Sequence, residues 1–377
     1  MIRPICWLGL LLVLSMALPV GAQRFEGGTV DLPQNATSFT MVNFNQPYTM
    51  APLVFGLGTN EGGDPGGIRI TNVTTTGFDI AFVEPLNLDG QHAAQTNVGY
   101  FVFDRNSVST PGPLTTQAGA INSSKPIHKN CCGGNFVGDT QNQNSDFDQV
   151  TFATPFTSGA PVLLAGLQSD NNELNDPPGN GEPSSPWLQV AVQTGSLTAS
   201  GFRTGLDRAE VSDIPDGNIS AESIGYTALE AGTFTFTDNA GNNITLRAFN
   251  TADNLVGWDD NNPDGSGVSA PVVVGNLNRR DGGDGGWLRR GAVSTTAVNL
   301  TVDEDTFTDG ERNHTSESAS IVAFSEAFAF SPSELGTIDA DFGDRRVGTT
   351  SNETFGVVEN TGGSALNGNI GSASGQF

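Results

Sequence analysis

The sequence predicts an all-β protein made of tandem antiparallel β-sandwiches. Residues 42–54 read VNFNQPYTMAPLV and residues 150–163 read VTFATPFTSGAPVL, while a third Ala-Pro pair at 270–271 precedes VVVGNL. The three Ala-Pro pairs begin at positions 51, 160 and 270, which gives spacings of 109 and 110 residues. No segment after residue 22 shows the 3.6-residue periodicity of a helix. Internal repetition with strand-like patterning therefore defines the fold class.

Each repeat predicts the same order of strands. An acidic loop rich in Gly or Asn follows the Ala-Pro strand, at 60–67, 169–176 and 280–286. A strand comes next, at 68–73, 187–192 and 287–293, and another opens at Gly77, Gly201 and Ala297. Alternating segments at 98–103, 222–230 and 317–328 close the repeats, as expected for strands with one buried face. Six or seven short strands per repeat are typical of a β-sandwich.

These patterns divide the chain into six parts. Residues 1–22 read as a secretory signal peptide, with Arg3 before an apolar run and small residues at its end. We expect a first sandwich at 23–106, a polar linker at 107–145, a second sandwich at 146–232 and a third at 233–332. The linker holds Cys131 and Cys132, for which buried thiols, a vicinal disulfide and a bridge to another chain are all open. Residues 338–377 resemble the opening half of the immunoglobulin-like ASH, or choice-of-anchor D, sandwich of bacterial surface proteins.

Composition excludes several classes of protein. Lys and Arg number 16 against 41 Asp and Glu, a net charge of −25, so the chain lacks the cations that a nucleic-acid groove needs. The sequence contains no G-x-S-x-G, H-E-x-x-H or P-loop motif, and we expect no enzyme activity. No second apolar run is long enough to span a membrane, which predicts a secreted or cell-surface protein once the signal is removed.

The repeats resemble the H-type lectin domain through the pattern F-x-x-P-[YF], A-P-x-V, an acidic loop, G-[IW]-R-[IV] and G-F-[DR]. The resemblance implies six-stranded sandwiches that trimerise and bind N-acetylgalactosamine-like sugars between protomers, through a Trp-His neighbourhood, an Arg and a loop Asp. The Trp that precedes the family's His is absent from all three repeats. The closing segments also resemble a D-G-x-H…E-x-[VI]-x-Y variant found in bacterial adhesins. The implied sugar contacts in this chain are His92, His314, Asp89, Asp216, Asp309, Trp187, Trp287, Arg69 and Arg289.

Each candidate also has a structural interpretation. His92 and His314 either donate to a sugar hydroxyl or bond their own loop backbone, and Trp187 and Trp287 either stack on a sugar or pack in the sandwich. The set Asp260, Asn262 and Asp264 matches the first half of a calcium loop, but Pro271 stands where the last EF-hand ligand belongs. A partial Ca²⁺ site and an acidic turn both remain open.

The sequence favours a non-catalytic binding protein whose partners are glycans or cell-surface glycoconjugates, with a role in adhesion. One alternative is a set of spacer repeats in a large surface adhesin or fibre, with no ligand of their own. Another is the accessory region of a secreted hydrolase whose catalytic domain lies elsewhere. The three repeats either pack around a common axis as a single-chain trimer or follow one another as separate beads, and self-association is open.

Overall fold

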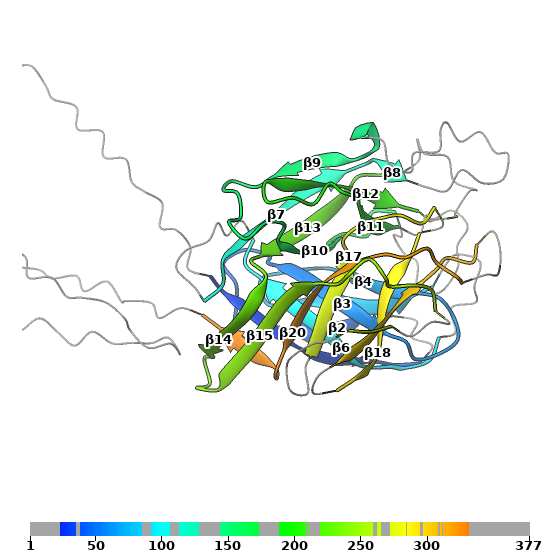
Figure 1. Ribbon diagram of the computed structural model, residues 1–377. Helices are drawn as coiled ribbons and strands as arrows, with labels where there is room; N and C mark the ends of the chain where they lie inside the picture. Colours follow the sequence, from blue (N-terminus) through cyan, green and yellow to red (C-terminus); the bar gives the residue numbers. More distant parts are fainter. Residues whose placement is uncertain are drawn as a thin grey trace, which may run out of the picture.

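The computed structural model shows an all-β chain, as predicted (Figure 1). It describes residues 23–34, 38–84, 92–105, 113–127, 144–172, 188–208, 210, 219–258, 262–264 (backbone only), 272–283, 285–294, 297–307, 310 and 312–331. The predicted signal peptide, the Cys pair and the ASH-like segment lie outside these residues. So do Asp89, Asp216, Asp309, Trp187 and Asp260.

Repeat 1 forms two three-stranded layers. Its inner layer has the order β1-β6-β3 and its outer layer the order β2-β5-β4. Gly77 opens β5, as the sequence predicts, and Phe78 and Ile80 on β5 pack inward against Tyr100 and Val102 of β6. The strands are β1 (Phe25–Leu32), β2 (Thr40–Asn43), β3 (Leu53–Thr59), β4 (Gly67–Thr71), β5 (Gly77–Val83) and β6 (Gln95–Phe103).

Repeat 2 has the same two layers, ordered β7-β13-β10 and β9-β12-β11. The prediction of a linker at 107–145 is wrong for residues 116–127. Residues 116–123 form β7, which pairs along its whole length with β13, because the sandwich needs a first strand equivalent to β1. The elements are β7 (Thr116–Ser123), β8 (Pro126–Ile127), the 3-10 turn η1 (Asn144–Asp146), β9 (Asp148–Thr151), β10 (Val162–Leu167), β11 (Gln189–Val192), β12 (Gly201–Asp207) and β13 (Glu222–Leu229).

Repeat 3 adds β14 to the inner layer of this plan and β21 beyond it. Its inner layer is ordered β14-β15-β20-β17 and its outer layer β16-β19-β18. Parallel pairing of β18 with β3 and antiparallel pairing of β21 with β1 join repeat 3 to repeat 1 through backbone hydrogen bonds. The strands are β14 (Gly232–Thr237), β15 (Asn243–Asn250), β16 (Asn262–Asp264), β17 (Val272–Leu277), β18 (Trp287–Val293), β19 (Val298–Asp303), β20 (Ala319–Phe324) and β21 (Phe328–Phe330).

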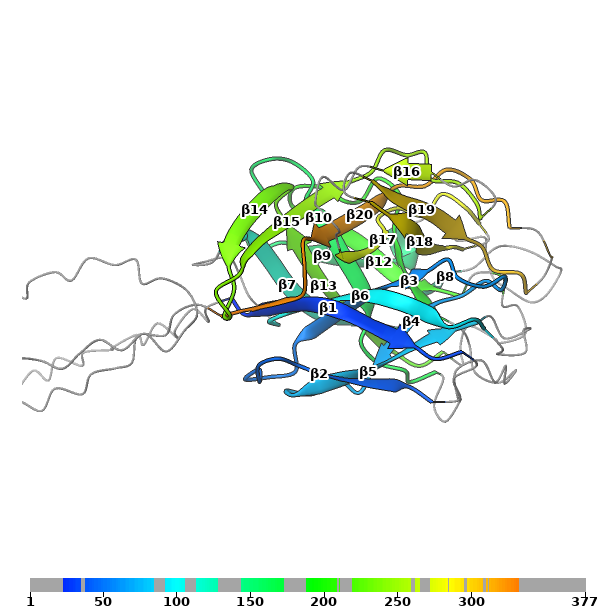
Figure 2. The ribbon, with the colours of Figure 1, turned by 90° about the horizontal axis from the view of Figure 1, so that it is seen from below.

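The three inner layers share one hydrophobic core, so the repeats pack together in one compact body rather than following one another as separate beads. Figure 2 shows the β1–β6 layer between β2–β5 on one side and the β14–β15 hairpin on the other. Phe25 of repeat 1 lies 5.2 Å from Phe236 and 4.9 Å from Phe330 of repeat 3, measured between ring centroids. Leu114, Val162 and Leu229 of repeat 2 belong to the same cluster. Because aromatic side chains of repeats 1 and 3 and aliphatic side chains of repeat 2 are buried together, each repeat depends on the others for stability.

The contacts between repeats follow a cyclic rule. The strands β3, β10 and β17, which follow the three Ala-Pro pairs, contact one another pairwise. By strand register, Gly99, Gly225 and Ser320 occupy equivalent positions on the closing strands. A β-carbon on Gly99 would overlap the Val273 carbonyl of repeat 3, one on Gly225 would lie 3.0 Å from Leu53 of repeat 1, and the Ser320 hydroxyl accepts from the Leu163 N–H of repeat 2. Each repeat therefore presents the same position to its neighbour around a threefold arrangement.

Where strands of different repeats meet at the centre of the molecule, polar side chains hydrogen-bond to backbone groups at the strand edges. The Gln168 amide both accepts from the Val54 N–H and donates to the Val54 carbonyl, at 2.9 Å each. The Asn276 side chain accepts from the Ala165 N–H at 2.9 Å. These amides satisfy backbone groups that would otherwise be buried without a partner.

Candidate functional site

Buried charged side chains lie at the seams between repeats, and Arg289, one of the sequence candidates, is among them. By strand register, Val83, Asp207 and Asp303 are equivalent, and so are Arg69, Ala191 and Arg289. The seam between repeats 1 and 3 and the seam between repeats 2 and 3 each contain a buried Arg–Asp pair.

Arg289 ties the acidic loop of repeat 1 to repeat 3. Its side chain, from β18, is fully buried and pairs with Asp303 on the neighbouring strand β19. Its remaining N–H groups donate to backbone carbonyls of repeat 1: Thr59 at 2.7 Å, Asp64 at 2.9 Å and Glu61 at 3.0 Å. Burial lowers the pKa of Arg289, and the neighbouring Asp303 opposes that change.

An aromatic ring completes this seam. Two guanidinium groups stack on the Trp258 ring, with Arg289 Cζ 4.6 Å and Arg312 Cζ 4.2 Å from the ring centroid. Arg312 also pairs with Asp303 and donates to the Gly63 carbonyl. Such stacking stabilises desolvated cations by about 2 kcal/mol. Trp258 and Arg312 are important seam residues that sequence reasoning missed.

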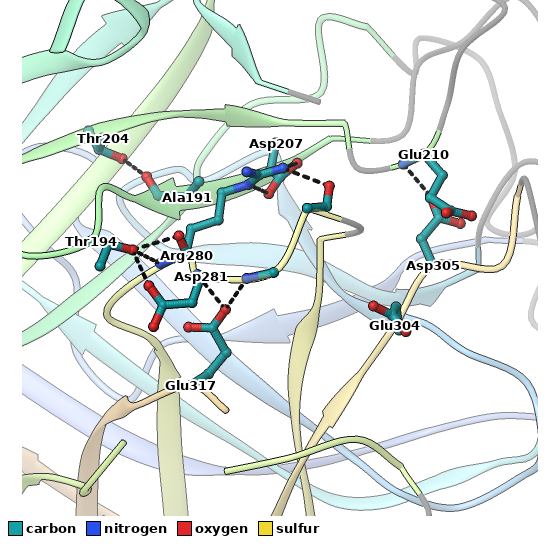
Figure 3. Close-up of polar contacts among 12 residues, drawn as sticks. Ala191, Thr194, Thr204, Asp207, Glu210, Arg280, Asp281, Glu304, Asp305 and Glu317 are labelled. Atoms are coloured by element: carbon teal, nitrogen blue, oxygen red, sulfur yellow. Dashed lines mark hydrogen bonds and ion pairs between the residues drawn. The ribbon is translucent and has the colours of Figure 1, made fainter. Parts of the chain in front are cut away.

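A second charged cluster lies where repeats 2 and 3 meet (Figure 3). Arg280 extends from repeat 3 and pairs with Asp207 of β12, with 2.5 Å between Nε and Oδ2. The Thr194 hydroxyl contacts the Arg280 carbonyl at 2.6 Å and the Asp281 carboxylate at 2.7 Å. Because each contact crosses from one repeat to the other, the cluster fixes their relative orientation.

Farther along the same seam, Asp305 is held by backbone groups. It accepts from the Glu210 N–H at 3.2 Å and the Phe307 N–H at 3.0 Å. Burial raises the pKa of Asp305 to about 7, an increase that these hydrogen bonds oppose and the negative charges of Glu210 and Asp207 reinforce.

His314 lies between two carboxylates and is 7% exposed. Its Nδ1 is 2.9 Å from Glu304 Oε1, and its Nε2 is 3.3 Å from Glu317 Oε1. Burial alone would lower its pKa, but hydrogen bonds and charge attraction from the two glutamates raise it to about 9. At neutral pH His314 is therefore a cation that bridges two acids.

The closing-strand glutamates organise the acidic loops. Glu317 accepts from the N–H groups of Asp281 at 2.7 Å and Gly282 at 3.0 Å. At the equivalent position in repeat 2, Glu222 accepts from the N–H groups of Asn171 at 3.2 Å and Asn172 at 3.0 Å. The Glu of the D-G-x-H…E pattern thus holds the loop of its own repeat.

The remaining described candidates are also buried. His92 is 2% exposed; its Nδ1–H donates to the Ala93 carbonyl at 2.9 Å, and its ring packs 5.2 Å from Phe82. Trp287 packs against Ala81 and Val83 of repeat 1, and Arg69 lines a cavity of about 120 Å³ where the three repeats meet. For these residues, the structure shows contacts with protein groups.

The described residues do not test the predicted calcium site. Asn262 and Asp264 belong to strand β16, which pairs with β19, and their side chains lie outside the described part of the chain. Within the described ranges, no three His, Cys, Asp or Glu side chains gather into a metal-binding group. The same ranges contain no helix long and apolar enough to cross a membrane.

Comparison with known proteins yields a distant similarity. No family model and no solved structure matches the chain. Halomucin of Haloquadratum walsbyi is 24% identical over 320 residues, which cover 81% of this chain and 3% of halomucin. The chain thus spans about 3% of the length of the curated relative that it matches.

Proposed function

We propose that this chain is a non-catalytic module of a secreted or cell-surface protein and that it binds glycans through lectin-like repeats. The observation that supports this proposal best is the threefold packing of three equivalent sandwiches around one core. The H-type lectin family, which the repeats resemble, forms trimers of separate chains, and here one chain provides all three copies. The similarity to halomucin supports the surface location, because mucins, the class in its name, are surface or secreted proteins.

The test is a glycan array probed with the chain lacking residues 1–22, with and without added Ca²⁺. We expect binding to a restricted set of glycans. Dependence on Ca²⁺ would indicate a metal site, whereas equal binding in both conditions would place recognition on protein groups alone. Binding to no glycan in either condition would overturn the glycan-binding proposal.

The burial of the family-like site residues favours a second candidate, a purely structural module. His92, His314 and Arg289 are each at most 7% exposed and contact protein groups. In this case the repeats act as a rigid unit within a long surface protein. High resistance to unfolding together with a negative glycan array would support it.

A further inference from the structure

A polar groove lies on the outer layer of repeat 2, and one of its lining residues, Thr194, also contacts Arg280 and Asp281 of the seam cluster. Strand alternation explains which side chains reach it. Phe202 of β12 and Val150 of β9 point into the sandwich and are buried, so their neighbours Arg203 and Gln149 point outward. The turn after β11, with Gly195 at a positive φ of 72°, forms the other wall.

The groove has a volume of about 440 Å³ and an unusual lining for this acidic protein. Its residues carry hydroxyl groups, amides or no side chain, except for one arginine, and none carries a carboxylate. Hydroxyl and amide groups offer both donors and acceptors, which is what a polyhydroxylated ligand requires. The lining consists of Asn144, Gln149, Thr151, Gln193, Thr194, Gly195, Ser196, Thr198, Ser200, Gly201 and Arg203.

Gln149 and Arg203, two of the groove's long side chains, are held in place by hydrogen bonds to protein groups. The Gln149 amide donates to the carbonyls of Val150 at 2.9 Å and Phe202 at 3.1 Å, and its oxygen accepts from Arg203 Nε at 2.7 Å. Arg203 Nη1 is buried from solvent and has no hydrogen-bond partner among the described residues. A guanidinium held by a neighbouring amide suits a planar carboxylate, and its fixed position lowers the entropy lost on binding.

The other two repeats show that the fold does not require this arginine. By strand register, Asp79 of repeat 1 and Asn299 of repeat 3 occupy the position of Arg203, while Met41 and Pro263 occupy that of Gln149. Met41 is 68% exposed, and Asp79 accepts from the Asn72 amide at 2.8 Å. The equivalent position is therefore negative in repeat 1, positive in repeat 2 and neutral in repeat 3, so only repeat 2 presents a cation there.

We propose that this groove binds an acidic saccharide, with a sugar carboxylate on Arg203 and sugar hydroxyls on the surrounding amide and hydroxyl side chains. The inference rests on the proposed glycan-binding function and gives it a site and a ligand class. The groove contains none of the residues that the lectin resemblance implies, and the described ones, such as His314 and Arg289, contact protein groups instead.

The test is calorimetric titration of the chain lacking residues 1–22 with a galacturonic acid trimer and, separately, with a neutral galactose trimer. We expect the wild-type protein to bind the uronate trimer more tightly, and Arg203→Gln to lose at least tenfold in that affinity. The control is Asp79→Asn, which changes the charge at the equivalent position of repeat 1 and should leave the affinity within twofold. Urea unfolding of both variants checks that the fold is retained.

The possible outcomes separate this inference from the broader function. Equal affinity of wild type and Arg203→Gln for the uronate trimer would overturn the proposal that the groove binds an acidic saccharide. So would preference for the neutral trimer, although glycan binding itself would then stand. If neither trimer binds and the glycan array is also negative, the groove and the proposed function fail together.

Discussion

Arg289→Met removes the cation that joins repeat 1 to repeat 3 while keeping most of the side-chain volume. The variant loses the ion pair to Asp303 and three hydrogen bonds to carbonyls of the 59–64 segment. Those carbonyls lie at a buried seam, and buried polar groups left without partners are costly.

The expected loss in the free energy of unfolding is about 4 kcal/mol, within the range for a buried ion pair that loses one partner. The cost should not rise far above that, because Asp303 keeps Arg312 and the Gly66 N–H as partners. The control is Arg290→Met, the same chemical change one residue along β18. Arg290 donates to the carbonyls of Thr96 and Asn97 at exposed positions and to that of its neighbour Gly291, and it has no buried ion pair among the described residues, so its replacement should cost about 1 kcal/mol or less.

Urea unfolding at constant salt, followed by tryptophan fluorescence and circular dichroism, measures both variants. Urea is preferred to guanidinium because it leaves the ionic strength unchanged. The reasoning would be refuted if the two variants lost equal stability, or if Arg289→Met lost less than 1 kcal/mol.

Three further predictions follow from the described contacts. Gly99→Ala should destabilise the protein by about 2 kcal/mol or more in urea unfolding, since its β-carbon would overlap the Val273 carbonyl. Gly63→Ala, whose β-carbon meets nothing within 4 Å, should change stability by less than about 0.5 kcal/mol, and similar losses would contradict the cyclic contact. Stability should fall between about pH 5 and pH 9, because folding raises the pKa of Glu26 and Asp305 to about 7 and that of His314 to about 9. A proton bound more tightly in the folded state stabilises it at low pH, and that contribution is lost as pH rises through the folded pKa. His314 alone contributes about 3 kcal/mol to this change, and a urea midpoint that rises over the same interval would contradict it. Small-angle scattering of a version ending at residue 331 should give a radius of gyration near 19 Å, as for one compact body, whereas three beads in a line would give about 28 Å.

The sequence predicted the positions of individual strands more accurately than the boundaries between repeats and linker. Turn residues and alternation correctly place β5 at Gly77 and β12 at Gly201, because local steric and burial patterns act over a few residues. The segment TQAGAINS at 116–123 has few bulky side chains and reads as a linker. It is a strand because β13 supplies its hydrogen-bonding partner from about 100 residues away along the chain.

By itself the sequence determined the all-β class, the threefold repetition and the acidic surface, since these depend on composition and short-range spacing. Only the tertiary structure decided what the charged residues do. Arg289 and His314 match a lectin-like pattern in the sequence, yet each is buried against carboxylates brought together by chain closure. The register between distant strands also distinguishes Arg203, on a polar groove, from Asp79 and Asn299 at the equivalent positions. Long-range pairing sets which polar groups lose water and which keep it, and that information is absent from any single stretch of sequence.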